Sequence, residues 1–110
     1  MGETIVSPVK RYVGEVVLAD PLTFPQVFAF EDAVEATRGL GDSATPMRVN
    51  SAMIPAIIAC VEEWRLTNFP AHPTPDTFPA TPVAASMQLI GWLITEITVL
   101  FREAEEVPNA

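Results

Sequence analysis

Residues 83–101 read VAASMQLIGWLITEITVLF, a nearly continuous apolar stretch close to the end of the chain. Polar or small residues recur along it at steps of three and four, which places them on one narrow line of a helix. That line consists of Gln88, Gly91, Thr95, Thr98 and Arg102. The rest of the helix surface is apolar, a pattern typical of a helix that is buried on most sides. We therefore expect a central helix over 82–106, covered by the rest of the chain.

A second helix is expected over 23–38. Thr23 and Gln26 have the spacing of a capping box, in which each side chain satisfies a free backbone N–H of the other's residue. Arg38 and then Gly39 stand where a helix ends, because a cation suits the negative end of the helix dipole and glycine suits the residue after it.

A third helix is expected over 46–66, where large apolar residues from Ile54 to Trp64 recur at helical spacing. Pro55 lies inside this segment and removes one helical hydrogen bond. Two alternatives follow: a kinked helix over 46–66, or a short turn at 46–52 followed by a helix that begins near Ile54.

The segment 1–20 predicts a β arm. Tyr12–Leu18 is rich in β-branched residues and indicates a strand, and Thr4–Val6 is a possible partner strand. Two alternatives are open: a hairpin or arm packed within the chain, or a strand that pairs with a neighbouring chain through its free edge.

Residues 67–81 form a Pro-rich segment in which regular helix and strand are both disfavoured. Phe69 and Phe78, each followed by proline, are too apolar for a free linker and predict an ordered loop held against the helices. Residues 107–110 are expected to form a frayed tail. The sequence thus predicts one domain, 1–110, of a mainly α class: a three-helix domain with a short N-terminal β-strand or hairpin and a Pro-rich ordered loop before the last helix.

Charge and cysteine content limit the partners. The net charge is −8, from fourteen acidic and six basic residues, and the basic residues are scattered. Nucleic-acid binding needs clustered Lys and Arg, so we expect no nucleic-acid partner. Glu96 inside the apolar stretch argues against a membrane span. The single cysteine, Cys60, and a first segment unlike a signal peptide predict a cytoplasmic protein.

The residues that usually carry catalysis or bind metals are few. His72 is the only histidine and Cys60 the only cysteine, so neither a metal site nor a nucleophile–base pair is indicated. Paired carboxylates such as Glu31 and Glu35 are expected to be a solvated helix face. We predict a protein that is not an enzyme and that has no cofactor, no metal and no catalytic residue.

Protein binding is the function that the composition favours. The 82–106 helix carries more apolar surface than two helices and a loop readily cover, and leaving such residues in water is costly. We expect protein partners and a homo-oligomer. The expected partner-binding residues are Tyr12, Val16, Trp64, Phe69, Phe78, Leu89, Trp92, Leu93 and Leu100.

The order of motifs resembles one family. LADPLTFPQVFAFEDAVEA (18–36), EEWRLTNFP (62–70) and FPATP (78–82) precede the long apolar helix, and together this is similar to the phage tail assembly chaperones encoded upstream of the tape-measure protein in long-tailed phages. The similarity covers roughly residues 12–101 and lies in the order of the parts.

The resemblance implies a helical factor in the host cytoplasm that holds the tape-measure protein and recruits tail-tube subunits. Two other functions compatible with the sequence are a structural virion subunit of a phage tail or head–tail connector, and a small inhibitor of a host protein.

Overall fold

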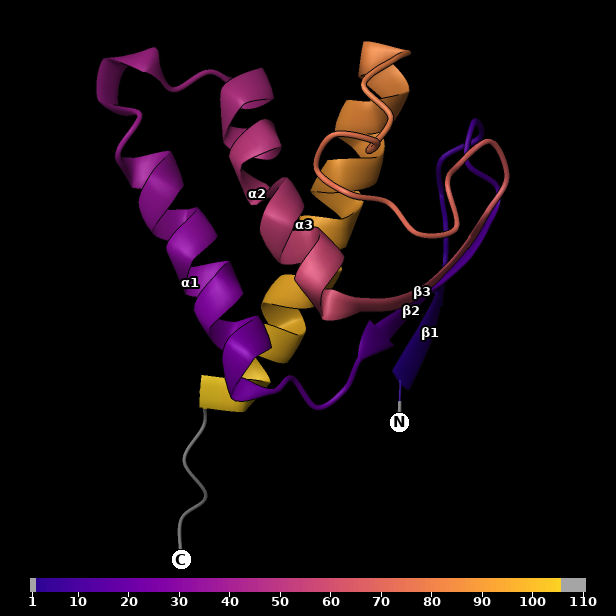
Figure 1. Cartoon of the computed structure of the whole chain (residues 1–110), viewed down its shortest axis with the longest axis horizontal. Coiled ribbons are helices and arrows are strands. Elements are labelled where there is room, and N and C mark those ends of the chain that lie inside the picture. Colours follow the sequence, from indigo (N-terminus) through magenta and orange to yellow (C-terminus); the bar gives the residue numbers. More distant parts are fainter. Residues whose placement is uncertain (1, 106–110) are drawn as a thin grey trace, which may run out of the picture.

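The computed structural model describes residues 2–105. Over these residues the chain forms three α-helices, three strands and one short 3-10 turn (Figure 1). In chain order they are β1 (Gly2–Val6), β2 (Gly14–Ala19), α1 (Phe24–Arg38), η1 (Gly41–Ser43), α2 (Pro46–Cys60), β3 (Val61–Leu66) and α3 (Val83–Glu105). The predicted tail at 107–110 lies outside the described residues.

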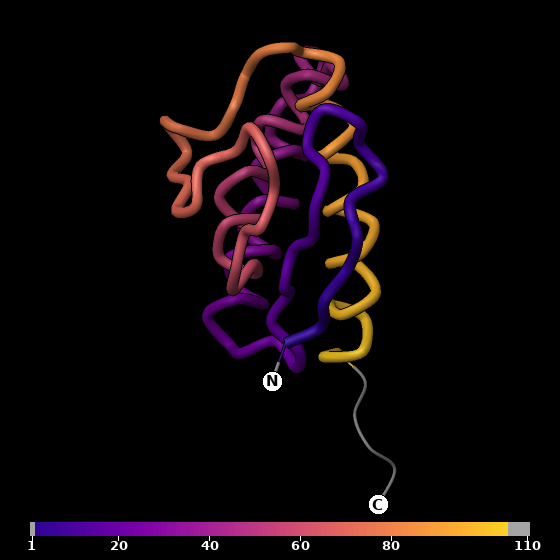
Figure 2. Tube along the Cα trace, turned by 90° about the vertical axis from the view of Figure 1, so that its right-hand side faces the viewer, coloured from indigo at the N-terminus to yellow at the C-terminus, as the bar shows by residue number. Residues whose placement is uncertain are grey.

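The strands form one antiparallel sheet in the order β1-β2-β3. The sheet lies on one side of the molecule, and the helices pack against it (Figures 1 and 2). The expectation of a mainly α, three-helix domain is therefore wrong, because the fold is mixed α/β. β2 is the central strand and pairs on both sides within its own chain. It therefore has no free edge with which to pair with a neighbouring chain, and that alternative is wrong.

The missed strand is β3. Residues 46–66 were expected to be one helix, but α2 ends at Cys60 and β3 begins at the next residue, with no loop between them. Val16 pairs with Trp64 and Leu18 pairs with Val61, so the register shifts along β3 and Glu62 has no partner. Such a bulge puts Val61 and Trp64 on the same sheet face although they are three residues apart. A spacing of three residues is also typical of one face of a helix, so the sequence pattern indicated a helix here.

The helices α1 and α2 begin with local caps. Gln26 Oε1 accepts a hydrogen bond from the Thr23 N–H at 2.8 Å, and Thr45 Oγ1 accepts one from the Arg48 N–H at 3.2 Å. α2 continues through Pro55, so the alternative of a helix that begins near Ile54 is wrong.

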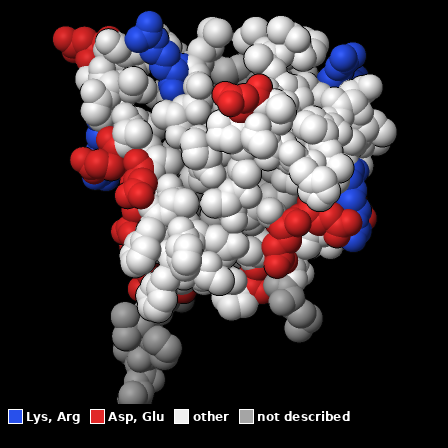
Figure 3. Space-filling model, in the orientation of Figure 1, with Lys and Arg blue, Asp and Glu red and all other residues white. Residues whose placement is uncertain are grey.

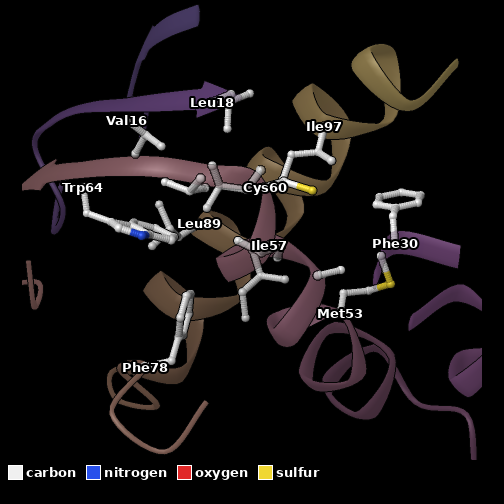
Figure 4. Close-up of a cluster of buried hydrophobic side chains, with 14 of the residues drawn as sticks. Val16, Leu18, Phe30, Met53, Ile57, Cys60, Trp64, Phe78, Leu89 and Ile97 are labelled. Atoms are coloured by element: carbon white, nitrogen blue, oxygen red, sulfur yellow. The ribbon is translucent and has the colours of Figure 1, made fainter. Parts of the chain in front are cut away.

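The core lies where the sheet, α2 and α3 meet (Figure 4). Val16 and Leu18 of β2 point from the sheet toward the helices, and Leu89 and Ile97 of α3 face them. Ile57 of α2 completes this layer, and all five side chains are almost fully buried. α3 is thus a core helix, covered on one side by the sheet, of which the sequence analysis predicted β1 and β2 but not β3, and on another side by α2.

The Pro-rich loop between β3 and α3 is fixed by its two phenylalanines. The Phe69 ring stacks on Trp64 with 4.8 Å between centroids, and the Phe78 ring meets Phe69 edge-on at 5.2 Å. Tyr12 packs edge-on against Phe69 at 5.5 Å from the turn between β1 and β2. These contacts join the loop to the sheet, as expected of an ordered loop.

Candidate protein-binding surface

Most of the residues expected to bind partners lie inside the chain's own core. Seven of the nine have at most 9% of their surface exposed: Tyr12, Val16, Trp64, Phe78, Leu89, Leu93 and Leu100. Phe69 and Trp92 are partly buried and pack against the same core. A partner could reach the seven only by opening the fold, so in this conformation the set does not form a surface.

Part of the apolar surface of α3 stays exposed, as the sequence predicts. Val83 and Val99 are its large apolar residues with the most exposure, at 46% and 51%. Among the described residues α3 is the helix long and apolar enough to cross a membrane, and 33% of its most apolar stretch is buried. A core helix meets the same criteria of length and hydropathy, so the absence of a membrane partner stays a prediction.

Two exposed aromatic side chains lie together at the start of α1. Phe24 is 79% and Phe28 55% exposed, and their rings stack with 6.0 Å between centroids and 19° between planes. Pro21, Leu22, Val27 of α1 and Ala104 of α3 line a shallow hollow beside Phe24. A stacked pair of aromatic rings beside an apolar hollow is the kind of surface that buries well against a partner.

The same side of α1 becomes acidic further along the helix. Glu31, Glu35 and Glu105 of α3 line a second hollow, together with Arg38 and the edge of Phe101. Arg38 Nη1 lies 3.4 Å from Glu35 Oε2, but both side chains are largely exposed and the pair contributes little. Figure 3, in the orientation of Figure 1, shows carboxylates gathered on the side where α1 lies. We call Phe24, Phe28, Glu31 and Glu35 the α1 face.

Phe24 and Phe28 were not among the residues that the sequence analysis expected to bind partners. A signal was present. At about 100° per residue, Phe24, Phe28, Glu31 and Glu35 fall within roughly 60° of one another around the helix. Aromatic residues that share a helix face with two carboxylates are placed toward solvent, whereas Phe30 lies on the opposite side and is buried.

A second groove, with Asp76 as the charged residue of its lining, lies between α2, the Pro-rich loop and the start of α3 and has a volume of about 260 Å³. Met47 and Val83, both about half exposed, stand on its walls, and Ile54, Met87 and Phe78 line its floor. Asn50 and Ser86 supply polar atoms, but each already has a partner: Asn50 Nδ2 donates to Met87 Sδ and Ser86 Oγ donates to the Pro79 carbonyl. The groove is therefore chiefly apolar.

The groups that could carry chemistry are kept apart. Within residues 2–105 no three His, Cys, Asp or Glu side chains gather in a way that could hold a metal ion. Cys60 is fully buried at the end of α2, and burial raises the pKa of its thiol to about 11. Its thiolate, the nucleophilic form, is therefore disfavoured at neutral pH. His72 is exposed in the Pro-rich loop.

On the outer face of the sheet, Arg65 of β3 joins two carboxylates across the strands. Its guanidinium lies 2.8 Å from Glu63 and 3.0 Å from Glu15, and the hydrogen bonding of Arg65 to Glu63 lowers the pKa of the Glu63 carboxyl below its usual value. All three side chains are about half exposed, so this cluster is a solvated cross-strand pairing and not a catalytic set.

The chain was compared with known proteins at three levels. Neither the models of protein families, nor the curated proteins, nor the solved structures contain a match. Among the surfaces described, the α1 face is the one with strongly exposed aromatic side chains.

Proposed function

We propose that this protein is a protein-binding assembly factor that holds a client on its α1 face, in the manner of a phage tail assembly chaperone. The observation that carries the proposal is the stacked and exposed pair Phe24 and Phe28. Exposed aromatic rings that lie together are unfavourable in water and become favourable when a partner covers them.

The charge of the chain suits this role. A net charge of −8 favours solubility of the protein while an apolar surface stays open. Carboxylates beside the aromatic pair, such as Glu31 and Glu35, also keep the exposed patch small and ringed by polar groups.

The resemblance of the sequence to tail assembly chaperones indicates which protein the client is. In this proposal the client is the tape-measure protein, tail-tube subunits are recruited afterwards, and the factor acts in the host cytoplasm. Self-association belongs to the same proposal.

Co-expression tests the proposal. The client to use is the very long, coiled-coil-like protein expected from the reading frame downstream. The native chain should raise the soluble fraction of that protein, and Phe24→Ser combined with Phe28→Ser should abolish the effect. Val99→Ser is the matched control, because Val99 is equally apolar and half exposed but lies on α3.

Two results would contradict the proposal. One is a client whose solubility does not change when the native chain is present. The other is the finding of the chain in purified particles, which would favour a structural virion subunit.

A further inference from the structure

The α1 face has an apolar end and an acidic end. Phe24 and Phe28 occupy the first two turns of the helix, and Glu31 and Glu35 follow on the same side. From Phe24 to Glu35 the face extends over eleven helical steps, or about 17 Å. A surface with this polarity selects partners by the order of their residues as well as by their composition.

The charge of the acidic end indicates which partner side chains it binds. Glu31, Glu35 and Glu105 line one hollow, where Arg38 is the only cation and is paired with Glu35. Three carboxylates against one paired guanidinium leave excess negative charge, which is best complemented by Lys or Arg of a partner.

The dimensions of the surface favour a short helix as the occupant. The hollow beside Phe24 and the hollow beside Glu31 lie one after the other between α1 and the end of α3. A helix of about 12 residues matches the 17 Å length and places side chains three and four residues apart on one side.

We propose that the α1 face binds an amphipathic helix of another protein that carries apolar side chains in its first turns and Lys or Arg in its last turns. Cations near its C-terminus also stabilise such a helix by opposing its dipole. The partner helix therefore runs in the same direction as α1, with its apolar end over Phe24 and its basic end over Glu31 and Glu35. This inference rests on the proposed function and names the chemistry of the client segment.

A second copy of the chain complements the acidic end poorly. Each of its three helices contains one basic residue, namely Arg38, Arg48 and Arg102. The adjacent pair Lys10-Arg11 lies in the turn between β1 and β2 and not in a helix. The occupant is accordingly a different protein.

Synthetic peptides test the inference directly. The probe is a fluorescein-labelled helical peptide of about 14 residues, long enough to span the face, with Leu and Phe in its first two turns and Lys in its last two. Its matched control has the same composition in reversed order, and a third peptide has Glu in place of Lys. Binding to the full chain is measured by fluorescence anisotropy.

The native chain should bind the first peptide more tightly than the reversed one. Glu31→Lys combined with Glu35→Lys should weaken that binding about tenfold, as expected for the loss of two partly exposed ion pairs, and should make the Glu-containing peptide the preferred probe. Both carboxylates are exposed, so an unchanged circular dichroism spectrum and melting temperature would show that the variant still folds.

The outcomes separate the inference from the proposed function. Equal binding of the two peptide orders, or no exchange of preference in the double Lys variant, overturns the inference. If the same variant still solubilises the tape-measure protein while Phe24→Ser with Phe28→Ser does not, the proposed function stands and the charge-based inference alone fails. Loss of client binding in both variants, with the expected exchange of peptide preference, supports both.

Discussion

Replacing Phe24 by serine tests whether the α1 face is surface or core. Phe24 hides only about a fifth of its surface, since 79% is exposed. Full burial of such a side chain is worth up to about 3 kcal/mol, so the substitution should lower the free energy of unfolding by about 0.5 kcal/mol. Leu93→Ala is the matched core variant. Leu93 is fully buried on α3, and the expected loss is about 3 kcal/mol.

The assay is equilibrium unfolding in urea, followed by far-ultraviolet circular dichroism. The slope of the free energy against urea should be the same for the native chain and both variants, so that the shift of the midpoint reports stability alone. A loss of about 2 kcal/mol or more for Phe24→Ser would mean that its ring is part of the core. The argument for an open aromatic surface would then be refuted.

Three further predictions concern particular residues. Cys60 should resist iodoacetamide at pH 8 in the folded chain and react on unfolding. Because its folded pKa is raised from 9.0 to about 11, stability should fall as pH rises through that window, and Cys60→Ala should remove this slope. Tyr12→Phe should stabilise the chain by about 1 kcal/mol, since the buried Tyr12 hydroxyl has no hydrogen-bond partner among residues 2–105; a loss of stability in the same urea assay would contradict this. Gly14→Ala should destabilise far more than Gly41→Ala in thermal melts. Both glycines have positive φ, but only at Gly14 would a methyl group meet backbone, at the Arg65 carbonyl, and equal losses would argue against that clash.

The helices were predictable because their signals are local. The capping residues Thr23 and Gln26 lie next to the turn that they stabilise, and α1 occupies Phe24–Arg38, close to the predicted 23–38. β3 was not predictable in the same way. Its strand character depends on pairing with β2, which is more than forty residues away in the sequence, and the bulge at Glu62 gives its apolar residues a helix-like spacing.

The binding surface was missed for a related reason. Composition shows that a helix such as α1 has many phenylalanines, but not how many of them the rest of the fold can cover. The three-stranded sheet packs against α3 and the start of α1 stays open, so Phe24 and Phe28 are exposed whereas Leu89 and Leu93 are buried. Which helix keeps a free face is decided by the tertiary arrangement.

The direct junction of α2 with β3 has a mechanical consequence. Because no residue separates Cys60 from Val61, no flexible loop joins the helix to the strand that follows it. A twist of α2 about its axis must be transmitted to the edge of the sheet, and the stacked indole of Trp64 lies only a few residues beyond the joint. The fluorescence of the Trp64 ring should therefore change when another molecule binds to α2 and displaces it.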